Sequence, residues 1–455
     1  MTSATTGGAA TGAAMTAAAP AASSATQHPS WHPATRVAFR FCVLYFGLYI
    51  FLTQMLTSLL LATTNDAGAF EVDMTAPVKA IVAWVAAQVF RIAHPLVMRE
   101  TGSGDRQYDW ILLAIMLFLA VVGTIVWSVL DRRRLSYPTL NKWFRLVARF
   151  ALGATLLTYG AAKIIPLQMP FPGLQRLIEP YGNLSPMGVL WASIGAAPAY
   201  EIFAGCAEFL GGMLVFLPRT ATLGAMICLA DGVQVFMLNM TYDVPVKLLA
   251  FHLIPLSLFV IAPDAKRLAN VLLFNRPAPV SSEQPLFRSA RNNRLALFAQ
   301  IVAGIFLITA NLYGSVSNYS TFGPGHPHSP LYGIWSVENF TSDGIVHPPL
   351  LTDNARWRRL IFDQPNTMII QAMDEVNRGF YANINMRAHG FELTRATDKN
   401  WKADFNFTQL PGDIMLLEGN FDGHHIVARL NLVDRSKMNL VNRGFHWVQD
   451  SPYNR

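Results

Sequence analysis

The chain has 455 residues, a length that does not suit a single domain. Charged residues make up 14%, where soluble globular chains average ~25%, while hydrophobic residues make up 52% and the mean hydropathy is +0.30. These figures exclude a soluble enzyme of this size and also a disordered or fibrous chain, and they predict a polytopic membrane protein with one water-soluble part.

Apolar runs of helix length recur along the first two-thirds of the chain. Each is near the ~20 residues that an α-helix needs to cross the hydrocarbon core of a bilayer. The sequence therefore predicts seven membrane spans, with the two termini on opposite sides of the membrane. The runs lie at about 37–62, 110–130, 145–165, 198–217, 219–240, 246–262 and 294–313.

The N-terminal residues are rich in Ala, Thr, Ser and Gly and contain no Lys or Arg, so they lack the basic start of a secretory signal. The predicted organisation in chain order is a disordered tail at 1–35, two spans with an outer interfacial helix at 36–144, a four-helix membrane bundle at 145–262, a basic cytoplasmic loop at 263–293, a last span at 294–314, a Gly/Pro/His linker at 315–329 and a β domain at 330–455.

The distribution of basic residues predicts the orientation of the chain in the membrane. Residues 315–455 hold 13 Lys/Arg and 14 Asp/Glu, so the excess of basic residues lies in the apolar part of the chain. This basic excess is expected to determine the membrane topology and not to bind nucleic acid. The loop DRRRLSYPTLNKWFR after the second span and the loop at 263–293 are both strongly basic and fall on the same side. The positive-inside rule predicts a bacterial plasma-membrane protein with its N-terminus in the cytoplasm and its C-terminal domain outside.

Residues 77–98 form a short apolar run interrupted by Lys79, Gln88, Arg91 and His94. A span here would put the two basic loops on opposite faces of the membrane. A helix lying at the outer interface is the better prediction.

Ionisable residues inside the spans are candidates for function, because burying them in lipid is costly. They fall on helical stripes that include glycines, and such stripes favour close helix packing. The stripes are Arg149, Gly153, Gly160 and Lys163 on the third span, Glu201, Gly205, Glu208 and Gly212 on the fourth, and Gly224, Cys228, Asp231 and Gln234 on the fifth, with Lys247 and His252 on the sixth.

Two interpretations compete for these groups. They either form buried ion pairs that fix the packing of the bundle, or they line an outward-opening pocket for a proton path or a quinone head group. Lys163, Glu201 and Lys247 fit both interpretations, since they can also pair at the interface. The mid-membrane depth of Glu208 and Asp231 favours function.

A lone His252 on an apolar helix is more typical of a satisfied buried histidine than of a metal ligand. Cys42, Cys206 and Cys228 all lie in apolar runs and form no C-x-x-C pair, so they are better interpreted as small hydrophobic residues than as redox centres.

The segments RFALGATLLTYGAAKI, AYEIFAGCAEFLGGMLVFLPRTATLGAMICLADGV and VKLLAFHLIPLSLFV resemble the DoxX family of four-helix membrane bundles over about residues 145–262. The resemblance rests on Leu152, Gly153, Gly160 and Lys163 in the first helix, on Glu208, Gly211 and Gly212 in the second, and on Arg219 in the following loop. It implies a link to quinone or redox partners, since DoxX-like proteins include a subunit of a thiosulfate:quinone oxidoreductase.

The exterior part changes to a period of two. FYANINM, KADFNFT and HIVARLNL alternate apolar and polar residues, and DG, QPN and PGD turn signals separate such runs. About nine strands with short sequential connections predict an up-and-down barrel rather than a sandwich. Such a barrel could hold an apolar ligand.

The first predicted strand contains Gly333 and Trp335, which resemble the Gly-x-Trp start of a lipocalin barrel. In that resemblance a late arginine packs over the tryptophan, and Arg443, before a predicted last strand GFHWVQ, would take this part. His424 and His425 would point to opposite faces of a strand, so no metal site is expected there.

Three functions follow as expectations. The first is an accessory subunit of envelope redox chemistry that binds quinone near Glu208 and Asp231 and works with a redox partner protein. The second is a small-solute or proton-coupled carrier that uses the same carboxylates. The third is a non-catalytic anchor whose β domain binds a lipid, an apolar ligand or a protein.

Overall fold

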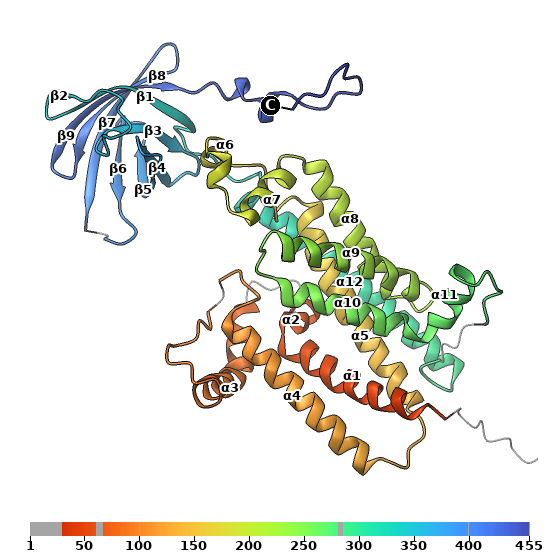
Figure 1. Ribbon diagram of the computed structural model, residues 1–455. Coiled ribbons are helices and arrows are strands. Elements are labelled where there is room, and N and C mark those ends of the chain that lie inside the picture. The colour runs from red at the N-terminus through yellow and green to blue at the C-terminus, as the bar shows by residue number, and fades with distance from the viewer. Residues whose placement is uncertain (1–29, 61–66, 100, 281–284, 399, 455) are drawn as a thin grey trace, which may run out of the picture.

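The computed structural model describes residues 30–60, 67–99, 101–280, 285–398 and 400–454. Figure 1 shows two parts, a bundle of helices and a C-terminal β-barrel that lies beyond one end of it. Most of the predicted disordered tail lies outside the described residues, and the first helix already begins at Pro33.

Every predicted apolar run contains a helix. The first run is broken at Thr53 into two helices. The helices are α1 Pro33–Leu52, α2 Gln54–Leu60, α3 Ala67–Gln88, α4 Gln107–Leu130, α5 Pro138–Ile164, α6 Leu174–Leu177, α7 Pro186–Gly195, α8 Pro198–Val215, α9 Ala221–Thr241, α10 Lys247–Ile261, α11 Ala265–Leu272, α12 Ala290–Phe322 and α13 Asn439–Asn442.

Within the described ranges, five helices are long and apolar enough to cross a membrane: α1, α4, α9, α10 with its continuation in α11, and α12. The pair α7 and α8, bent by 97° at its break, would make a sixth. The deeply buried helix α5 is not among them, and it carries Lys142, Arg145, Arg149 and Lys163.

Glycines bring α5 and α8 into backbone contact. A Cβ atom on Gly153 would lie 2.8 Å from the carbonyl oxygen of Gly212, and one on Gly160 would lie 2.9 Å from that of Gly205. Separations this short leave no room for a side chain. The predicted glycine stripes therefore face each other, as in the close helix pairs of membrane proteins.

The other side of α8 packs on α9 in the same way. A Cβ on Gly224 would meet the backbone nitrogen of Val215 at 2.6 Å, and one on Gly211 would meet the Sγ of Cys228 at 3.1 Å. Helix α8 is thus held between α5 and α9 by small residues on both of its faces.

The segment 77–98 is helical only to Gln88, where α3 ends. Its apolar helical part, Ala76–Gln88, is short for a span. Figure 1 shows α3 nearly end-on beside the lengthwise α4, so the two helices cross. The position of this helix relative to a membrane stays a prediction.

The C-terminal domain is a closed antiparallel barrel. Its nine strands follow the order β2-β1-β3-β4-β5-β6-β7-β8-β9, and β1 also pairs with β9, so eight strands close the barrel while the short β2 extends a hairpin. The predicted up-and-down topology is confirmed. The strands are β1 Gly333–Ser342, β2 Ile345–Val346, β3 Trp357–Phe362, β4 Thr367–Ala372, β5 Asn377–Asn385, β6 Gly390–Thr394, β7 Lys402–Leu410, β8 Ile414–Phe421 and β9 His424–Leu432.

Aromatic side chains occupy the interior of the barrel. Trp357 contacts Phe340, Phe405 and Phe421 with ring centroids 5.2–5.7 Å apart, and Trp335 is buried in the same cluster. The inward-facing residues of the alternating strands thus form a packed core, as in other small barrels.

The expectation that Arg443 packs over Trp335, as in a lipocalin barrel, is wrong. Gly333 opens β1 and the indole nitrogen of Trp335 donates a hydrogen bond to the Leu331 carbonyl, as a barrel-end tryptophan should. However, GFHWVQ is not a strand, because β9 already closes the barrel on β1. Arg443 lies in the exposed extension that follows β9, where it bonds to Gln449 and stacks over Tyr453.

The barrel touches the bundle through the segment around α6. The backbone nitrogen of Leu174 donates to the carboxylate of Asp363 at 3.1 Å, and Leu174 packs on Ile334 and Ile361 of the barrel. The predicted linker at 315–329 is helical in its first half, because α12 continues to Phe322. These contacts place the barrel at the end of the bundle where α5 ends.

Gly160→Ala should destabilise the folded chain by about 1–3 kcal/mol, the usual cost of forcing extra atoms into a packed site. The added methyl would strike the backbone of α8 at Phe209 and Gly205. Thermal unfolding in detergent measures the loss. Gly379→Ala is the control, since a Cβ there meets nothing within 4 Å. Equal midpoints for the two variants would contradict the glycine contact.

Asp353→Asn should destabilise the barrel at pH 7 by about 1 kcal/mol, and the loss should be smaller at pH 3, below the usual carboxyl pKa of ~3.9. The hydrogen bond from His347 Nδ1, at 2.7 Å, lowers the pKa of Asp353, with smaller contributions from the N–H groups of Ala355 and Arg356. A lowered carboxyl pKa stabilises the fold above ~3.9, the usual value, and this contribution is lost as the pH falls through the lowered pKa.

Tryptophan fluorescence during unfolding of the full chain measures this effect at both pH values. The control is Asp413→Asn, an exposed carboxylate whose side chain makes no hydrogen bond in the described part of the chain. An unchanged gap between Asp353→Asn and the unsubstituted chain at pH 3 would contradict the assignment.

Candidate functional site

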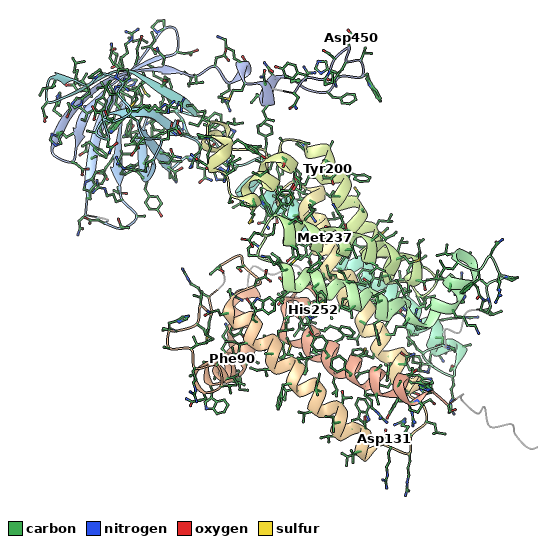
Figure 2. The ribbon with its side chains drawn as sticks, viewed as in Figure 1. Phe90, Asp131, Tyr200, Met237, His252 and Asp450 are labelled. Atoms are coloured by element: carbon green, nitrogen blue, oxygen red, sulfur yellow. The ribbon has the colours of Figure 1, made fainter. Side chains whose placement is uncertain are left out.

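A cavity of about 260 Å³ lies inside the bundle, in the half that faces the barrel. It is bordered by α5, α7, α8, α9 and α10 and by the loop after α5. In Figure 2, Tyr200, one of its lining residues, lies near the barrel-facing end of α8. The polar lining residues that sequence analysis selected are Lys163, Glu201, Glu208, Asp231 and Gln234.

Lys163 and Glu208 form a buried ion pair across the α5–α8 contact. The ammonium Nζ donates to Oε1 of Glu208, and the two side chains are only 8% and 3% exposed. Lys163 thus pairs with Glu208, which lies about two turns along α8 from Glu201. The glycine contact at Gly160 and Gly205 brings the lysine stem against α8, so its long side chain reaches this carboxylate.

Glu201 is held by the loop that follows α5. Its Oε1 accepts a hydrogen bond from the backbone nitrogen of Met169 at 3.0 Å, while its Oε2 is buried without a donor. The side-chain oxygen of the neighbouring Gln168 is also buried without a donor. The backbone carbonyl of Gln168 accepts a hydrogen bond from the indole of Trp191. Hydrogen bonds to the backbone therefore hold the loop at the rim of the cavity. Gln168 Oε1 and Glu201 Oε2 remain free to accept hydrogen bonds from a ligand.

Unsatisfied acceptors converge on this cavity. Eight buried side-chain nitrogen or oxygen atoms of the described residues lack a hydrogen-bond partner, and four of them line it: Gln168 Oε1, Glu201 Oε2, Glu208 Oε2 and Asp231 Oδ2. All four are oxygens. A buried acceptor without a donor is costly, and native structures keep few of them. The cavity is thus arranged for a molecule that donates hydrogen bonds.

Three predicted residues lie outside the cavity lining. Lys247 is partly buried, and its Nζ pairs with Asp243 at 2.9 Å and with Asp105 at 3.8 Å, which favours the ion-pair interpretation. His252 is buried, stacks on Tyr49 at 3.7 Å and bonds to the Tyr45 hydroxyl and the Leu248 carbonyl. It is a satisfied core histidine. Cys228 is buried against Gly211.

The cysteines and histidines do not assemble a centre in the described part of the chain. All three cysteines are free, with Cys206 exposed and Cys228 buried. No group of three His, Cys, Asp or Glu among the described residues could hold a metal ion. His424 and His425 bond to different carboxylates, those of Asp343 and Glu418.

Sequence reasoning missed part of the cavity wall. Gln168 and Trp191 come from the loop after α5 and from α7, which lie between the predicted spans. Tyr159 and Asn239 also line the cavity, and both stand on predicted spans as polar groups. Their polarity was a usable signal, whereas the position of the loop depends on the bend between α7 and α8.

The comparisons with known proteins give the chain a relative but no activity. It is similar to a protein of Bacillus subtilis described as uncharacterized protein YwoB, with 29% identity over 140 residues, which is 31% of this chain and 87% of that protein. No family model matches the chain, and no solved structure matches it.

Lys163→Met should destabilise the protein by as much as about 3–5 kcal/mol, because it leaves the Glu208 carboxylate buried without its cation. Adding Glu208→Gln to this variant should restore most of the loss, since no charge then remains uncompensated. Thermal unfolding of both variants in detergent provides the measurement. A double variant no more stable than Lys163→Met would show that Lys163 and Glu208 do not stabilise the protein as an ion pair.

Proposed function

We propose that the cavity is the working site of the protein and that it binds the head group of a quinol, as a DoxX-like accessory component of envelope redox chemistry. The convergence of four unsatisfied oxygens on one cavity supports this most strongly. Ionisable groups buried inside a membrane bundle are the usual sign of a ligand or proton pathway.

The donor and acceptor balance selects the reduced form of the ligand. A quinol carries two hydroxyl donors, which the carboxylate oxygens of Glu208 and Asp231 can accept. The oxidised quinone offers only acceptors and would leave these oxygens unpaired. The volume of about 260 Å³ is near the lower end of ligand pockets and suits a single substituted ring, whose isoprenoid tail would extend into the lipid.

The proposed setting is a bacterial plasma membrane, with seven spans, the N-terminus in the cytoplasm and the barrel outside. The basic loops support it, because they meet at the bundle end opposite the barrel. There Arg36 bonds to the Arg134 carbonyl, and Lys142 bonds to the Pro285 carbonyl. The positive-inside rule assigns such an end to the cytoplasm. The cavity then opens toward the barrel side, where a redox partner protein of the envelope would exchange electrons.

A second candidate function is a proton-coupled carrier of a small solute with hydroxyl or amino donors. The same unsatisfied oxygens favour it, and the Lys163–Glu208 pair would supply the proton-linked step. Aromatic side chains already fill the barrel interior. In the anchor interpretation, a lipid or protein partner would therefore bind to the outer surface of the barrel.

Asp231→Asn should lower the quinol retained by the purified protein by about tenfold, which is one charged hydrogen bond of about 1.4 kcal/mol. Asp231 suits the test because its Oδ2 has no partner, so the change breaks no bond of that atom. Extraction of the full-length protein purified from native membranes, followed by mass spectrometry, counts the quinol and quinone per chain.

The matched control is Asp243→Asn, an 83% exposed carboxylate outside the cavity lining. Quinol retained equally by the Asp231 variant, or no more abundant than in an unrelated membrane protein, would overturn the redox proposal. If the quinol results exclude the redox proposal and the Asp231 variant loses uptake of a small solute into proteoliposomes, the carrier function replaces the redox proposal.

A further inference from the structure

A second and larger cavity lies at the end of the bundle that is opposite the barrel. It has a volume of about 1560 Å³ and is open to the outside between α5, the α8–α9 turn, α11 and the start of α12. In Figure 1, α11 lies at the far end of the molecule from the β strands. This cavity shares no lining residue with the carboxylate cavity, so the two are separate sites.

Cationic side chains gather on its wall. Lys142, Arg145, Arg149, Arg219 and Arg267 line it, and among its described lining residues the one carboxylate is that of Asp264. Asp264 already bonds to Arg267 at 2.7 Å and to the hydroxyl of Thr222 at 2.6 Å. The cavity therefore attracts anions.

Two of the cations retain uncompensated charge. The ammonium of Lys142 bonds to a neutral acceptor, the carbonyl of Pro285, at 3.0 Å. Arg219, in the turn between α8 and α9, has no hydrogen-bond or ion-pair partner within the described ranges. Both are therefore placed to meet a negatively charged group from outside the chain.

The rest of the wall is apolar and continues onto the lipid-facing surface. Leu223, Leu272 and Leu297 line the cavity and are 55%, 65% and 42% exposed. An inorganic phosphate or a soluble nucleotide would gain nothing from these leucines. A molecule with an anionic head and long hydrocarbon chains would contact both kinds of surface at once.

We propose that this cavity is a binding site for an anionic phospholipid, whose phosphate lies between Lys142 and Arg219 and whose acyl chains run over the leucines of α9, α11 and α12. Basic pockets between membrane helices on the cytoplasmic side are suited to such head groups. The site fixes the α8–α9 turn and α11 to the lipid at the level of the head groups.

Native mass spectrometry of the full-length protein in detergent tests the site, with phosphatidylglycerol and phosphatidylcholine as the probes. Phosphatidylglycerol should bind to the unsubstituted chain and phosphatidylcholine should bind much more weakly. The double variant Lys142→Gln/Arg219→Gln should weaken the binding of phosphatidylglycerol about thirtyfold. This fold-change corresponds to about 1 kcal/mol of electrostatic attraction lost for each of the two charges.

The matched control is Arg288→Gln/Arg291→Gln, which removes two exposed charges at the same end of the bundle but outside the lining. It should leave the binding of phosphatidylglycerol within about twofold, because neither side chain lines the cavity. Equal loss in both double variants would overturn the site and indicate a general surface attraction.

Two further arms distinguish the sources of the phosphate and do not depend on any variant folding. Raising the salt from 0.1 M to 1 M should weaken phosphatidylglycerol binding to the unsubstituted chain severalfold. Millimolar inorganic phosphate should not displace the lipid. Equal binding of the two lipids, salt-independent binding, or displacement by inorganic phosphate would each overturn the assignment to an anionic lipid.

Discussion

The backbone contact between α5 and α8 is the constraint on which the rest of the bundle depends. Gly153 and Gly160 lie against Gly212 and Gly205 so closely that no side chain fits between them. Because lipid chains are as apolar as leucine, helices in a bilayer gain most from such close packing rather than from burial alone. The contact also places the stem of Lys163 against α8, and this makes the ion pair with Glu208 geometrically available.

The polar groups buried in the bundle include some with hydrogen-bond partners and some without. His252 has partners on both ring nitrogens and stacks on Tyr49, so it stabilises the core. Four of the eight buried side-chain atoms without a partner among the described residues line one cavity, and all four are oxygens. Stability alone does not favour such an arrangement, because each unpaired buried acceptor costs free energy. A ligand with hydrogen-bond donors would remove that cost.

The two ends of the bundle present opposite chemistry. The half that faces the barrel carries the carboxylates of Glu201, Glu208 and Asp231, whereas the far end carries Lys142 and Arg219. Anionic lipid head groups favour the basic end, and a ligand rich in donors favours the acidic cavity. The barrel rests on the loop that leads from α5 to that acidic cavity, through Leu174 and Asp363.

The sequence by itself determined the broad architecture, because burial in lipid and burial in a barrel impose periods that can be counted. Apolar runs predicted helices, and alternation predicted about nine strands, although GFHWVQ, which was expected to be the last strand, is not one. The glycine stripes predicted close helix packing, and the structure brings the stripes of α5 and α8 together. Only the tertiary structure decided the partner of Lys163, since helix spacing places residues on a face without fixing how far a long side chain reaches. It also decided that Arg443 lies away from Trp335, and that Gln168 and Trp191 join the cavity, because a loop is positioned by the elements that it connects and not by a period of its own.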